Sequence, residues 1–96
     1  TVVVDIPLGF VPVPEAAKVL RAAARQLREN PDLRDELLGE PELLGVEAVT
    51  SGGTVFRTSI RTTPDAQWKV ARTLRRLQTE ALQQAGLVPS QAPGST

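Results

Sequence analysis

The pattern that most constrains this chain is an alternation of three extended apolar runs with two stretches in which apolar residues recur every three or four positions. The first extended run covers residues 2–8. The other two, 43–50 and 54–63, flank a glycine-rich turn that is typical of a β-hairpin. The helical spacing covers 15–30 and 66–85. The predicted order is therefore strand, helix, strand, strand, helix.

Strand residues alternate between two faces, so each run predicts which side chains turn toward the helices. The predicted inward residues are Val2, Val4, Ile6 and Leu8 in the first run, Leu44, Val46 and Ala48 in the second, and Phe56, Thr58 and Ile60 in the third. The inward stripe predicted for the last helix is Val70, Leu74, Leu77 and Ala81, widened by Ala71 and Leu82. Residues 32–38 predict a further short helix before Gly39.

Two helices that cover one face of a mostly antiparallel sheet predict an α+β fold, a ferredoxin-like two-layer sandwich of the order β-α-β-β-α. Leu87 and Val88 could add a short final strand. The predicted domain covers residues 1–88, and residues 89–96 form a tail without a pattern that buries apolar surface. Because the chain begins at Thr1 rather than methionine, we expect it to be a piece of a longer protein.

The residue types that are missing argue against an enzyme. The 96 residues include no histidine and no cysteine, so the commonest general base, the commonest metal ligand and the thiolate nucleophile are all absent. No stretch approaches the ~18 consecutive apolar residues of a membrane-spanning helix. We therefore expect no catalytic residues, no metal and no cofactor.

The placement of charged residues is the one pattern in the sequence that points to a functional surface. The chain is neutral, with 11 basic and 11 acidic residues, yet between positions 29 and 47 seven carboxylates stand against one arginine, a local net charge of −6. Basic residues recur at helical spacing in both long helices. The candidate interface residues are Lys18, Arg21, Arg25, Arg28, Lys69, Arg72 and Arg76 on the helices, Asp32, Asp35 and Glu36 in the acidic segment, and Trp68.

Three interpretations of these charges stay open. The basic stripes can be the solvated faces of amphipathic helices. They can also meet the acidic segment of a second copy, because complementary charges fix how subunits align. A nucleic-acid surface is disfavoured, since only 3% of the residues are aromatic. Trp68 lies away from the predicted stripe of its helix; it either covers the corner between strand and helix, which we favour, or anchors an interface.

Two segments carry a resemblance to a known family. Residues 41–47 read Pro-Glu-Leu-Leu-Gly-Val-Glu, and residues 62–68 read Thr-Thr-Pro-Asp-Ala-Gln-Trp before an arginine-rich helix. Together with the valine-rich start at 2–7 and the helix at 16–27, they resemble the C-terminal cytoplasmic α/β domain of small-conductance mechanosensitive (MscS-type) ion channels. The resemblance covers residues 1–88.

This resemblance implies a ring of identical subunits, typically a heptamer, whose pore opens under membrane tension and releases ions and osmolytes. The full-length protein would lie in the cell membrane, with this domain on the cytoplasmic side. This segment would lack the pore, would help to assemble the ring and shape its vestibule, and would bind no nucleic acid. The alternative is a ligand-binding regulatory module of ferredoxin-like fold attached to an enzyme or transporter, which would show a convergent polar pocket at a sheet edge or dimer groove.

Overall fold

The computed structural model describes residues 1–87 and confirms the predicted order of elements. The elements are β1 (Val2–Leu8), α1 (Val13–Arg25), β2 (Glu42–Thr50), β3 (Gly53–Ile60) and α2 (Gln67–Gln84), with short 3₁₀ turns η1 (Gln26–Glu29), η2 (Arg34–Glu36) and η3 (Pro64–Ala66). The possible final strand lies outside the described residues beyond Leu87, whose N–H donates to the Leu82 carbonyl at 2.9 Å. The tail at 89–96 also lies outside them.

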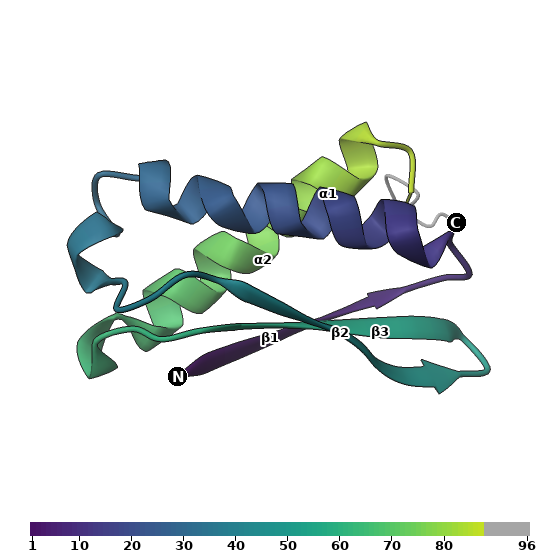
Figure 1. Cartoon of the computed structure of the whole chain (residues 1–96), viewed down its shortest axis with the longest axis horizontal. Helices are drawn as coiled ribbons and strands as arrows, with labels where there is room; N and C mark the ends of the chain where they lie inside the picture. The colour runs from purple at the N-terminus through teal and green to yellow at the C-terminus, as the bar shows by residue number, and fades with distance from the viewer. Residues whose placement is uncertain (88–96) are drawn as a thin grey trace.

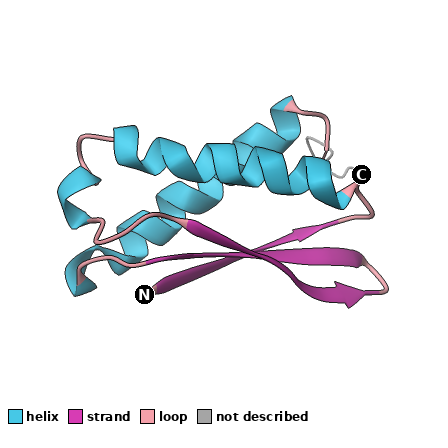
Figure 2. Ribbon diagram, in the orientation of Figure 1, coloured by secondary structure: helices cyan, strands magenta, loops and turns pink. Residues whose placement is uncertain are grey.

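The three strands form one antiparallel sheet in the order β1-β3-β2. β1 and β2 each pair antiparallel with β3, so they run in the same direction and form the two edges. Both helices lie over the same face of the sheet and cross one another, as Figures 1 and 2 show. α1 packs against α2 and β2, and α2 packs against β1. The predicted two-layer α+β sandwich is confirmed.

The core lies between the sheet and the helices. Its buried members include Val2, Val4, Ile6 and Leu8 from β1, Phe56 and Ile60 from β3, Ala16, Leu20 and Ala24 from α1, Leu27 from η1, and Val70, Leu74 and Leu82 from α2. Pro14 stands in the first turn of α1, where its missing N–H costs nothing. Small alanines on the buried face of α1 let the helix approach its neighbours closely.

The inward face predicted for β2 is wrong at Leu44, whose place toward the core is taken by Leu43. Leu44 is 52% exposed and Val46 is 39% exposed, whereas Leu43 packs against the core. The pairing with β3 shifts twice, between Leu43 and Gly45 and again between Val46 and Ala48. The shifts insert Leu44 and Glu47 as extra residues. Leu43 and Val46 therefore lie opposite the inward residues Thr58 and Phe56, and Val46 stays partly exposed because β2 is an edge strand. Gly45 has a φ of +97°, a conformation that other residues rarely adopt.

The stripe predicted for α2 is shifted. Val70, Leu74 and Leu82 are buried as predicted, but Gln78 is buried between them, while Leu77 and Ala81 are half-buried. The Nε2 of this buried glutamine donates to the Thr58 hydroxyl at 3.0 Å and to the Leu20 carbonyl at 3.3 Å, whereas its Oε1 accepts no hydrogen bond from the described residues.

The short helix predicted at 32–38 is also wrong, because only residues 34–36 form a 3₁₀ turn. Tertiary hydrogen bonds fix this segment in place of a helical ladder. The Leu38 N–H donates to the Arg61 carbonyl at 2.8 Å, and Leu37 forms an isolated bridge with Thr62. Leu33 is buried, and Leu38 is 55% exposed.

Candidate functional site

The basic residues predicted on the first helix form one exposed row along α1 and η1. Lys18, Arg21, Arg25 and Arg28 are all exposed. Arg28 Nη1 lies 3.1 Å from Glu40 Oε2 and 3.5 Å from the Gly39 carbonyl, so this residue ties η1 to the chain that enters β2. Among residues 1–87, Lys18, Arg21 and Arg25 form no ion pair and no side-chain hydrogen bond.

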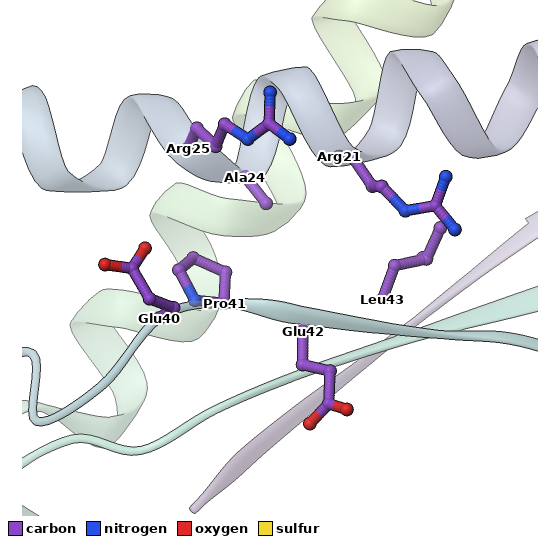
Figure 3. A pocket seen from close by; sticks show the side chains of 7 residues that line it. All are labelled: Arg21, Ala24, Arg25, Glu40, Pro41, Glu42 and Leu43. Atoms are coloured by element: carbon purple, nitrogen blue, oxygen red, sulfur yellow. The ribbon is translucent and has the colours of Figure 1, made fainter.

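Arg21 and Arg25 border a cleft of about 320 Å³ between α1 and the start of β2 (Figure 3). The cleft is lined by Arg21, Ala24, Arg25, Glu40, Pro41, Glu42 and Leu43. Figure 3 shows the Glu42 carboxylate on the other side of the strand from the two guanidinium groups. Since Glu40 pairs with Arg28, the cleft has an apolar base and two unpaired cations at its rim.

The basic residues of α2 lie on its exposed surface. Lys69, Arg72 and Arg76 are exposed, and Arg76 pairs with Glu80 at 3.3 Å within the same helix. Trp68, in the first turn of α2, is 81% exposed. The prediction that it covers the strand-to-helix corner is therefore wrong, because so exposed a side chain covers little of the protein.

Some carboxylates of the acidic segment bond to other residues of the fold, and others do not. Glu36 Oε1 accepts a hydrogen bond from the Thr63 hydroxyl at 2.6 Å, and Glu40 and Glu47 pair with arginines. Asp32 and Asp35 are exposed, and within residues 1–87 their carboxylates form no ion pair or hydrogen bond. The structure thus separates Glu36, a structural residue, from its two neighbours.

An ion network on the outer face of the sheet was not predicted. Arg57 Nε and Nη2 donate to the two Asp5 carboxylate oxygens at 2.8 and 2.9 Å, and Arg57 Nη1 lies 3.2 Å from Glu47. The hydrogen bond from Arg57 holds the pKa of Asp5 below its ordinary value of 3.8, and the same bond raises the pKa of Arg57. The outward positions of Asp5 and Arg57 were visible in the alternation, but the register that places them opposite one another was not.

A second groove, of about 300 Å³, lies between β1 and α2. Its lining includes Asp5, Pro7 and Leu8 on the strand and Arg75 and Leu82 on the helix. Within the described part of the chain, no group of three or more acidic side chains could hold a metal ion. No helix in residues 1–87 is long and apolar enough to cross a membrane.

Comparison with known proteins adds no relative to this picture. No protein-family model matches the chain, and no curated protein matches it significantly.

Proposed function

We propose that this chain is the cytoplasmic assembly and vestibule domain of a mechanosensitive channel of the MscS type. The complete protein would be a membrane homo-oligomer, a heptamer, that releases ions and osmolytes under tension. The observation that carries the proposal is the pair of resembling segments, 41–47 and 62–68, which cover the first part of β2 and the entry into α2. In the first of these, Gly45 occupies a conformation that favours glycine, which gives the glycine of that segment a physical reason.

The topology supports the same proposal at the level of fold. The order β1-β3-β2 with both helices on one face corresponds to three strands of a ferredoxin-like sandwich. In such a sandwich a fourth strand would lie along β1, on the side where β1 and α2 border the second groove. We infer that the domain has this fold.

The charge distribution supports a role in assembly. The surface is neutral in sum but carries cations on α1 and α2 and unpaired carboxylates at Asp32 and Asp35. Complementary patches on one chain favour contact between copies and determine their alignment. In this role the domain has no catalytic residue and needs no cofactor.

The test is to express the complete protein that contains this chain in bacteria that lack their own tension-gated channels. Patch-clamp recording of their membranes should show a current that appears under suction, and the cells should survive a sudden drop in osmolarity. A membrane that carries the protein at normal levels but passes no current at any tension up to rupture would overturn the proposal.

The cleft at the β2 edge favours one second candidate, the ligand-binding regulatory module. Two unpaired guanidiniums above an apolar base could bind a small carboxylate or phosphate compound. Calorimetry of the 96-residue chain against a panel of such anions would reveal it as saturable binding that Arg21→Gln with Arg25→Gln abolishes. Absence of saturable binding would leave the assembly role as the explanation of the cleft.

A further inference from the structure

We infer that the cleft between α1 and β2 receives Asp32 and Asp35 of a second copy of this chain. The inference deepens the proposed assembly role and rests on it, because it names the contact by which neighbouring copies would recognise one another. It also narrows the predicted interface to charged residues that have no partner within residues 1–87. Arg28, Arg76 and Glu36 are left out, because each bonds to another residue of its own chain.

The receiving side is a pair of cations held at a fixed separation. Arg21 and Arg25 stand four residues apart on α1, which places their stems about 5–6 Å apart on one side of the helix. Neither has a carboxylate partner within residues 1–87, although Glu40 and Glu42 line the same cleft. Glu40 pairs with Arg28, and the Glu42 side chain lies across the strand in Figure 3. No carboxylate among residues 1–87 therefore pairs with these two guanidiniums.

The entering side is a turn that presents two carboxylates. Asp32 lies in the turn before η2 and Asp35 lies within η2, three residues further on, and both side chains are exposed. The Asn30 carbonyl accepts hydrogen bonds from the Leu33 and Arg34 N–H groups at 3.1 and 3.0 Å. Leu33 is buried, so the turn is anchored to the core. A turn that is already ordered loses little conformational entropy when it binds.

Apolar surface matches on the two sides as well. Ala24, Pro41 and Leu43 are the apolar residues that line the cleft, and the acidic turn continues into Leu38, whose side chain is 55% exposed. An apolar contact beside two ion pairs excludes water and strengthens the pairs. Neither aspartate forms an ion pair with Arg21 or Arg25 of its own chain, so both sides remain available to a neighbour.

Cysteine cross-linking tests this contact directly, because the chain has no cysteine of its own. Arg21→Cys and Asp35→Cys are placed in two separately tagged copies of the complete protein, which are co-expressed and treated with a short bifunctional thiol reagent. A product that carries both tags is expected. The matched control replaces Asp35→Cys with Glu15→Cys, an exposed acid at the other end of α1, and should give no such product.

Charge reversal supplies an independent measurement. Because exposed ion pairs are individually weak, Arg25→Glu should lower the cross-linking yield by only about threefold to tenfold. Asp32→Lys in the partner copy should restore much of the loss. Raising the salt concentration toward 1 M should lower the cross-linking yield of the Arg21→Cys and Asp35→Cys copies that carry no charge reversal, since the Debye length falls to about 3 Å.

The outcomes separate this inference from the proposed function. A tension-gated current without a mixed-tag product overturns the contact and leaves the channel proposal standing. A mixed-tag product without any current supports the contact and overturns the channel. Equal yields from Asp35→Cys and Glu15→Cys, or a yield that is insensitive to charge reversal, would also overturn the contact.

Discussion

The two faces of the sheet are built in different ways. The face beneath the helices carries Val4, Ile6, Phe56 and Ile60, all of them buried. The outer face carries the Arg57 network, and neither helix covers it. The same three strands therefore combine a dry apolar layer with a solvated charged one.

This difference separates what stabilises the fold from what is available for recognition. Burial of a large aliphatic or aromatic side chain contributes about 1.5–3 kcal/mol, whereas an exposed ion pair contributes little, because water and salt screen it. Substitutions on the inner face should therefore change the free energy of unfolding. Substitutions on the outer face and on the exposed helix surfaces should change mainly pH dependence and contacts with other molecules.

The largest effect is expected from Leu74→Ala, which leaves a cavity between α2 and the sheet. Leu74 is fully buried, so the free energy of unfolding should fall by about 2–5 kcal/mol in urea denaturation of the 96-residue chain. The matched control is Arg75→Ala, next in sequence and exposed, which should stay within about 0.5 kcal/mol. Equal losses at the two positions would mean that the wrong side of α2 has been placed inward.

A smaller effect is expected from the buried polar pair on the inner face. Thr58→Val removes the hydroxyl that accepts a hydrogen bond from Gln78 Nε2 and should cost about 1–3 kcal/mol, because the amide then lacks a partner for one of its protons. Combining Thr58→Val with Gln78→Leu removes both polar groups and should recover most of the loss. A double variant as unstable as the sum of the two single ones would contradict this coupling.

The ion network on the outer face should make the stability of the fold depend on pH. Since Arg57 lowers the pKa of Asp5 in the folded chain, the contribution of this pair is present above the ordinary pKa of 3.8 and is lost as the pH falls through the lower, folded value. The Asp5 and Arg57 side chains are 40% and 32% exposed, so the effect should be smaller than that of Thr58→Val. Thermal melts between pH 2 and pH 6 should be flatter for Asp5→Asn than for the unaltered chain. Parallel curves would show that the pair does not contribute.

The smallest effect on stability is expected at Trp68. Because this side chain is 81% exposed, Trp68→Ser should change the free energy of unfolding by no more than about 0.5 kcal/mol. If Trp68 belongs to an interface, its fluorescence should shift to shorter wavelength when copies assemble, as the indole leaves water. A large loss of stability in the isolated chain would instead mean that the Trp68 side chain stabilises the fold.

The sequence predicted the order of the elements, the inward residues of β1 and β3 and the position of both helices. It could do so because the spacing of apolar residues in a long segment indicates whether the segment is a helix or a strand and which side of it is buried. It could not predict the two bulges of β2, since they depend on how β2 pairs with β3 and not on the apolar pattern of β2 itself. The burial of Gln78 depends on Leu20 and Thr58, which lie far from it in sequence. Likewise, the distinction between Glu36 and Asp35 rests on Thr63, a contact that only the folded chain brings together.

The most direct test of the assembly role is the mass of the complete protein, purified in detergent at low salt. A closed ring of identical copies, with one narrow mass peak near that of a heptamer, is the expected result. A monomer at every protein concentration, in a preparation whose domain is folded by circular dichroism, would contradict the proposal that this chain assembles a channel.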